Sequence, residues 1–168
     1  MNSLQSHFIS RGIRIAWICC ETIESLTSQY SSLPGVKDSP IFADPQQEVA
    51  HALGILEPGP QPSNAAFVIG PGKTLNLSIL YPAALARNYR ELVRAVDALQ
   101  LSASMRLCTP GNWRQGQECI IPQSIGTEDA KQMFPMGVRI VDLPSRIGYL
   151  RYTPQPINPA PNAPPGTV

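Results

Sequence analysis

The segment AAFVIGPGKTLNLSILYP, residues 65–82, constrains the fold more than any other part of the chain. Two apolar runs flank Gly70-Pro71-Gly72-Lys73, and glycine and proline are the residues that tight turns favour. Apolar runs of strand length around such a turn predict an antiparallel hairpin with a four-residue connection. We therefore expect β-structure in the middle of the chain.

Strands and helices alternate around this hairpin. The run IRIAWIC is short and almost continuously apolar, as in a strand that is covered on both faces. Capping residues, prolines, glycines and apolar periodicity place the other elements. In chain order we expect the last turns of a helix over 3–11, a strand over 13–19, a helix from Glu21 or Thr22 to about Tyr30, a loop over 31–40, a strand over 41–44, a helix over 45–56, a loop over 57–64 and, after the hairpin, a helix over 86–102.

This order predicts an α/β core followed by a small α+β lobe. The chain has 168 residues, 43% of them hydrophobic, which suffices for one ordinary domain with an appendage. From about Met105 the elements become short and are separated by proline and glycine. We predict a core over residues 1–104, a lobe over 105–153, and a disordered or extended Pro-rich tail over 154–168.

The charge and hydropathy of the chain argue against several classes of partner. The net charge is +1, only 15% of the residues are charged, and the basic residues are scattered. No basic face for nucleic acid or an anionic membrane is expected, and no stretch approaches the roughly 18 apolar residues of a membrane span. The first residues contain no apolar core of a secretion signal. We therefore expect a soluble, cytoplasmic protein.

The four cysteines, at positions 19, 20, 108 and 119, match neither a disulfide framework nor a zinc site. A chain of this size does not need disulfides for a stable core. No C-x-x-C pattern occurs, and the two histidines, His7 and His51, lie far from the cysteines in sequence. We predict no metal and no cofactor.

Cys19 and Cys20 lie at the junction of the expected strand and helix, and three interpretations are open. A helix N-terminus could lower a thiol pKa and make the pair a redox centre. Alternatively the two residues alternate across the end of a buried strand as small hydrophobes, which we favour. A disulfide between adjacent cysteines would be strained, so we do not expect one.

Several segments resemble the 1-Cys peroxiredoxins, the peroxiredoxin subclass with a C-terminal extension. They are LNLSILYPA, ARNY with the helix after it, TPGNWRQG and YLRYTPQP, and, more loosely, GIRIAWICCETIES and SPIFADPQQEVAHALGIL. The resemblance covers residues 3–156. It implies a thioredoxin-like, three-layer peroxiredoxin fold and an antioxidant function, the thiol-dependent reduction of hydroperoxides.

The chain departs from this family at its catalytic residues. The family's peroxidatic cysteine lies in a Pro-x-x-x-Thr/Ser-x-x-Cys loop, and none of the four cysteines here has that environment. The position of one catalytic arginine falls on Asn64, which cannot supply a fixed positive charge. A second active-site arginine is retained as Arg87. The resemblance thus implies an N-terminally truncated fold in which residues 3–11 are the end of the helix that carries the catalytic cysteine.

The resemblance also predicts the contacts of this chain. The missing part includes a central strand, whose loss leaves two unpaired interior edges, so we expect low stability or dependence on another chain. The edge strand LNLSILYP pairs between subunits in the family, which makes Leu77, Ile79 and Leu80 dimer candidates. The expected assembly is a homodimer, or a heterodimer with a full-length peroxiredoxin.

Two functions follow from these observations. The first is a catalytically incompetent family member that acts as a dimer-forming remnant or interaction module. The second is an active thiol peroxidase, either with a longer true N-terminus or with Cys20 in an improvised site.

Overall fold

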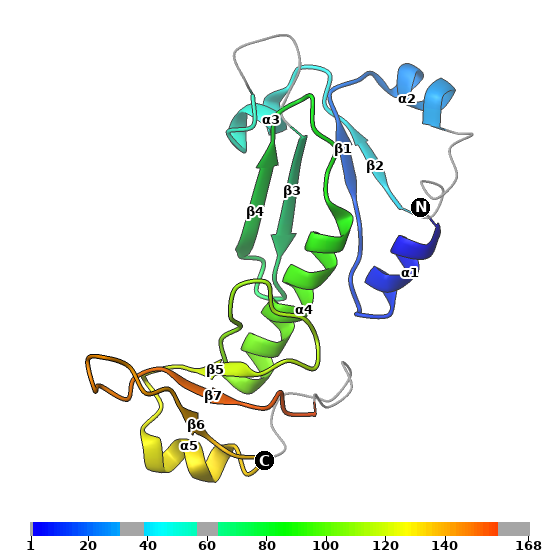
Figure 1. Ribbon diagram of the computed structural model, residues 1–168. Helices are drawn as coiled ribbons and strands as arrows, with labels where there is room; N and C mark the ends of the chain where they lie inside the picture. The colour runs from blue at the N-terminus through cyan, green and yellow to red at the C-terminus, as the bar shows by residue number, and fades with distance from the viewer. Residues whose placement is uncertain (1, 31–38, 57–63, 158–168) are drawn as a thin grey trace. The chain divides into compact units, whose positions relative to one another are not determined.

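The computed structural model describes residues 2–30, 39–56 and 64–157, with the side chains of the first helix described from Gln5 onward. The chain forms two compact units, Met1–Tyr89 and Arg90–Val168 (Figure 1). This division, after Tyr89, lies upstream of the boundary at residue 104 that the sequence predicts. The assignment of a core, a lobe and a tail stays a prediction. Most of the loops predicted at 31–40 and 57–64, and of the Pro-rich tail, lies outside the described residues.

The first unit contains the predicted alternation of helices and strands. Its elements are α1 (Asn2–Ile9), β1 (Trp17–Cys19), α2 (Ile23–Tyr30), β2 (Ile41–Ala43), α3 (Glu48–Ala52), β3 (Asn64–Ile69) and β4 (Leu75–Tyr81). The backbone N–H of Ser25 donates to the Thr22 hydroxyl oxygen at 3.3 Å, so Thr22 caps α2 as expected. The strand predicted over 13–19 forms only at its end, because β2 offers pairing for three residues.

The strands of this unit form two separate sheets. β1 and β2 are parallel and pair from Trp17 with Ile41 to Cys19 with Ala43. β3 and β4 are antiparallel. Across the unit the strands follow one another as β4, β3, β1 and β2 (Figure 1), and among the described residues no ladder joins β3 to β1.

The β3–β4 pair is the hairpin that the sequence predicts. The N–H of Gly70 donates to the carbonyl of Thr74 at 2.9 Å, and that of Lys73 donates to the carbonyl of Gly70 at 3.0 Å, which closes the turn. Lys73 has a φ of 60°, in the left-handed region. The register shifts between Val68 and Ile69, so β4 carries a bulge where it leaves the turn.

The second unit is built on a long helix and a small antiparallel sheet. The helix α4 (Tyr89–Met105) begins at the division between the units and is followed by β5 (Cys119–Ile121), α5 (Thr127–Met133), β6 (Arg139–Ile140) and β7 (Arg151–Thr153). The sheet order is β5, β7, β6. The helix is amphipathic as predicted, with Leu92 and Val96 buried.

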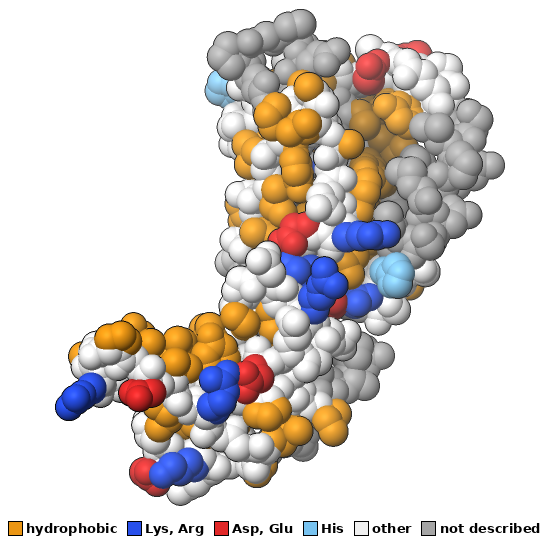
Figure 2. Space-filling model, viewed as in Figure 1, with side chains coloured by type: hydrophobic (Ala, Val, Ile, Leu, Met, Phe, Trp, Pro, Cys, Tyr) orange, Lys and Arg blue, Asp and Glu red, His pale blue; other side chains and the backbone are white. Residues whose placement is uncertain are grey.

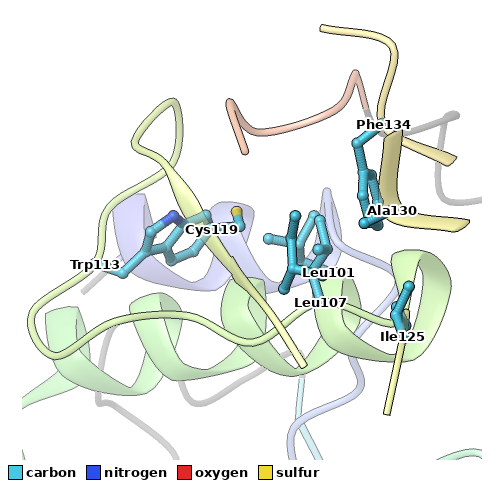
Figure 3. Packing of buried hydrophobic residues seen from close by; sticks show 8 residues of the cluster. Leu101, Leu107, Trp113, Cys119, Ile125, Ala130 and Phe134 are labelled. Carbon is cyan, nitrogen blue, oxygen red and sulfur yellow. The ribbon is translucent and has the colours of Figure 1, made fainter. Parts of the chain in front are cut away.

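A buried hydrophobic cluster holds the second unit together (Figure 3). Its members come from α4, the loop after it, β5, α5 and the residues around α5: Leu101, Leu107, Trp113, Cys119, Ile121, Ile125, Ala130 and Phe134. The Trp113 indole N–H is satisfied by the carbonyl of Gln117 at 3.2 Å. Nearby, the buried Arg151 guanidinium donates to the carbonyls of Pro122, at 2.9 Å, and Ile125, at 2.6 Å, which ties β7 to the segment before α5.

None of the helices within the described ranges combines the length and apolar character needed to cross a membrane.

Leu107 is fully buried in the cluster, so its truncation tests how much the cluster contributes to stability. We expect Leu107→Ala to lower the free energy of unfolding by about 2–5 kcal/mol, because the lost contacts leave a cavity. Urea unfolding followed by tryptophan fluorescence measures this. Ile147→Ala, at a side chain that is 62% exposed, is the matched control and should change stability by less than about 0.5 kcal/mol.

Candidate functional site

Cys19 and Cys20 lie at the carboxyl end of β1, directly before α2. β2 runs parallel to β1, so Asp44, the residue after β2, lies at the same end. The backbone N–H of Asp44 donates to the carbonyl of Cys19 at 2.8 Å. The parallel pairing therefore brings a thiol pair and a carboxylate together.

Asp44 is buried, with 6% of its surface exposed, and its carboxylate has a structural role. One oxygen accepts the N–H of Ala50 at 2.9 Å, and the other accepts that of Val49 at 3.3 Å. These bonds satisfy the first N–H groups of α3. The helix starts at Glu48 and not at Pro45 as the sequence predicts, because Gln47 has a φ of 58°, in the left-handed region. Asp44 was missed as a member of this site, although an aspartate just before a helix is a recognisable capping signal.

Arg87, which follows β4, connects this end of β1 with β3. Its Nε donates to the carbonyl of Ala65 in β3 at 2.7 Å. Its positive charge also acts on the Cys19 thiol and lowers that group's pKa, against the larger opposite effect of burial. Arg87 therefore binds the backbone of β3 while its charge acts on Cys19 at the end of β1.

Asn64 holds the segment between β4 and α4. Its side-chain amide donates to the carbonyls of Ala83, at 3.1 Å, and Leu85, at 2.9 Å. These two bonds fix the backbone that leads to Arg87. Asn64 thus has a structural role that a neutral donor can fulfil.

The pKa values of both thiols are raised. For Cys19 burial is the main cause, partly offset by Arg87, and Glu21 raises the pKa further. For Cys20 burial is again the largest cause, followed by Asp44, Cys19 and Glu21. Since the thiolate is the nucleophile, a raised pKa means that both groups are mostly neutral and weakly reactive at pH 7.

The other two cysteines lie in the second unit. Cys119 is fully buried in the hydrophobic cluster, and burial raises the pKa of its thiol. Cys108 is exposed and pairs through its backbone with Ile120. Neither belongs to the site at the end of β1, and the described residues contain no group of three metal-binding side chains.

The predicted dimer residues lie on β4, whose second edge pairs with no other described strand. Leu77 and Ile79 are half-buried on one face of the hairpin. Leu80 lies on the opposite face with 49% of its surface exposed.

Comparison with known proteins identifies the family. No family model matches the chain. The 1-Cys peroxiredoxin A of Oryza sativa subsp. japonica is 38% identical over 165 residues, which cover 91% of this chain and 75% of the rice protein. The chain belongs to the 1-Cys peroxiredoxins.

Two further relatives agree with this assignment. Peroxiredoxin-6 of Gallus gallus is 45% identical over 124 residues, which cover 70% of this chain and 55% of that protein. The crystal structure of a cysteine-to-serine mutant of the peroxiredoxin 6 of Arenicola marina superimposes with a TM-score of 0.83 at 36% identity, over 93% of this chain and 76% of that one. The predicted thioredoxin-like peroxiredoxin fold is confirmed, and the protein belongs to a family of antioxidant peroxidases.

The charge of Arg87 should increase the reactivity of Cys19, although burial has the larger effect on the pKa of this thiol. We expect Arg87→Met to raise the Cys19 pKa, because it removes the positive charge that stabilises the thiolate. The rate of Cys19 alkylation by iodoacetamide at pH 8 should fall by about threefold, as the thiolate fraction falls. Mass spectrometry of alkylated peptides over a pH series measures the change.

Glu21→Gln is the control of opposite sign, because Glu21 raises the pKa of both thiols. It should speed alkylation of Cys19 and Cys20 together, whereas Arg87→Met should act chiefly on Cys19. Equal slowing of both thiols in Arg87→Met would indicate a conformational change and contradict the electrostatic role.

Proposed function

We propose that residues 1–168 form a peroxiredoxin without peroxidase turnover, which acts as a dimer-forming interaction module. The sequence observation that carries this proposal is the absence of the Pro-x-x-x-Thr/Ser-x-x-Cys environment at all four cysteines. The raised pKa values of Cys19 and Cys20 support it. A cytoplasmic location, and the absence of nucleic-acid, membrane and metal partners, remain predictions.

Peroxide reduction makes demands that this site does not meet. A thiolate attacks one peroxide oxygen, the O–O bond breaks, and the sulfur becomes a sulfenic acid while the second oxygen leaves as water or an alcohol. The thiolate needs a low pKa, and the departing oxygen needs a positive charge or donors. Here Asn64 is neutral and its amide donates to two backbone carbonyls, so it supplies no charge, and the charge of Arg87 does not outweigh the effect of burial on the pKa of Cys19.

The β4 strand supports the interaction role. It spans seven residues, and in the described part of the chain it pairs only on the β3 side. Leu75 and Leu80 are 57% and 49% exposed. A long apolar edge strand favours pairing with another strand, and a second copy of β4 around a two-fold axis would continue the sheet.

The alternative is a thiol peroxidase that uses Cys20. This residue precedes the N-terminus of α2, where backbone N–H groups can stabilise a thiolate. Peroxidase activity is the family reaction, so the alternative needs a direct test.

The first test is turnover of hydrogen peroxide by purified residues 1–168 with dithiothreitol as reductant. We expect peroxide loss no faster than with an equal concentration of free cysteine, because the raised pKa values of Cys19 and Cys20 leave little thiolate at pH 7. Peroxide consumption and sulfenic acid at each cysteine are measured. Rapid turnover that disappears in Cys20→Ser, and persists in Cys108→Ser, would establish the alternative.

The second test addresses the β4 edge. The register places Phe67 opposite Ser78, in a pair whose backbone groups point away from the partner strand, so the Ser78 N–H faces the free edge. Ser78→Pro removes this donor without breaking the β3 ladder, and should convert a dimer into a monomer at micromolar concentration. Size-exclusion chromatography with light scattering measures the mass. Ser78→Thr keeps the N–H and should remain dimeric; a monomeric unaltered protein would refute the dimer.

A further inference from the structure

An open apolar pocket of about 180 Å³ lies in the second unit, between the end of α5 and the segment after β7. One wall is formed by residues 133–136 and the other by residues from the segment 153–157. Apart from Thr153, every lining residue is a methionine, phenylalanine, proline or isoleucine. Two of these side chains are thioethers, and 43% of Met133 and 59% of Met136 is exposed. The pocket thus presents sulfur to solvent in a largely hydrocarbon wall.

A tight turn after α5 fixes the first wall. The N–H of Phe134 donates to the carbonyl of Ala130 at 2.9 Å, and the N–H of Gly137 donates to the carbonyl of Phe134 at 3.0 Å. Gly137 has a φ of 118°, which only glycine adopts readily. Phe134 is 5% exposed and belongs to the buried hydrophobic cluster (Figure 3). Because Phe134 is held inside, Met133 and Met136 on either side of it stay at the surface.

The second wall is tied to the sheet and to the loop before β5. Thr153 is fully buried, and its pairing with Cys119 anchors the end of β7. The side-chain carbonyl of Gln155 accepts the backbone N–H of Gly116 in that loop. Ile157, at the far end of the wall, is 89% exposed. Both walls are therefore held by contacts outside the pocket, so the pocket is preformed.

Thioether and thiol sulfurs react with peroxides under different conditions. A thiol must first lose its proton, and burial raises the pKa of three of the four thiols in this chain. A thioether has no proton to lose, so its reactivity depends on exposure and not on pH. Among the described methionines, Met105 packs against the hydrophobic cluster, whereas Met133 and Met136 are exposed. Figure 2 shows hydrophobic side chains at the surface of both units. The pocket methionines are therefore accessible sulfurs whose reactivity does not depend on a pKa.

We propose that Met133 and Met136 form a methionine-oxidation site, at which a hydroperoxide converts both thioethers to sulfoxides and makes the pocket wall polar. A sulfur lone pair attacks one peroxide oxygen, the S–O bond forms as the O–O bond breaks, and the other oxygen takes the proton and leaves as water or an alcohol. Each sulfur is oxidised by two electrons and each peroxide is reduced by two. The site belongs to a different unit from Cys19 and Cys20 and does not require their thiolates. Two polar sulfoxides lower the affinity of the pocket for apolar groups.

The first experiment exposes the purified chain to hydrogen peroxide without a reductant, at pH 6 and at pH 8. Mass spectrometry of digested samples follows oxidation at each methionine and cysteine over time. We expect sulfoxide at Met133 and Met136 to form at least about fivefold faster than at Met105, because exposure controls access to the sulfur. These rates should be equal at the two pH values, whereas oxidation of Cys19 and Cys20 should rise about tenfold per pH unit as thiolate forms. Equal rates at all three methionines, or methionine rates that rise with pH as the thiol rates do, would overturn the proposal.

The second experiment measures the change in the pocket with the dye anilinonaphthalene sulfonate, which binds exposed apolar surface. Peroxide treatment of the unaltered chain should lower the dye fluorescence by about half or more, as the wall becomes polar. The double variant Met133→Leu/Met136→Leu keeps the volume and apolar character of the wall, so its fluorescence should survive the same treatment. Met105→Leu is the matched control and should lose fluorescence as the unaltered chain does. No loss in the unaltered chain, or an equal loss in the double variant, would overturn the proposal. Methionine sulfoxide reductases A and B should restore the fluorescence, and this reversal decides the case if the double variant does not fold.

Discussion

Backbone hydrogen bonding at the strand edges is the constraint on which the first unit depends. β1–β2 and β3–β4 are each a two-stranded pair, so within the described residues each pair keeps two edges that pair with no further strand. Unpaired backbone groups are tolerated at a solvated edge and are costly when buried. The proposed dimer at β4 is a consequence of this requirement.

Parallel pairing of β1 with β2 also determines which groups surround the Cys19 and Cys20 thiols. The carboxyl ends of β1 and β2 bring Cys19, Cys20 and Asp44 together. Asp44 uses its carboxylate to cap α3, and Arg87 uses its Nε to bind the backbone of β3. Charged groups near the thiols thus maintain the fold, and their net effect with burial is a raised pKa at both cysteines.

Much of the first unit could be predicted from local sequence. The hairpin around Gly70–Lys73 was predicted because turn residues and flanking apolar runs are adjacent in the chain. The length of β1 was overestimated: the sequence predicts a strand over 13–19, and the strand spans Trp17–Cys19. Its length depends on how many residues β2 can pair with it. The cap from Asp44 was missed because Pro45 is itself a common first helical residue, and only the structure shows that the helix begins later.

The sequence by itself determined the order of the elements, the membership of the 1-Cys peroxiredoxins and the absence of the peroxidatic pattern around the four cysteines. These properties depend on residues that are close together or on recognisable segments. Tertiary structure decided that Arg87 binds Ala65, that Asp44 lies beside the thiols, and that β1–β2 and β3–β4 form two separate sheets. The reason is physical: the direction of a backbone group depends on which distant strand pairs with its neighbours, and that pairing is not encoded in the local pattern.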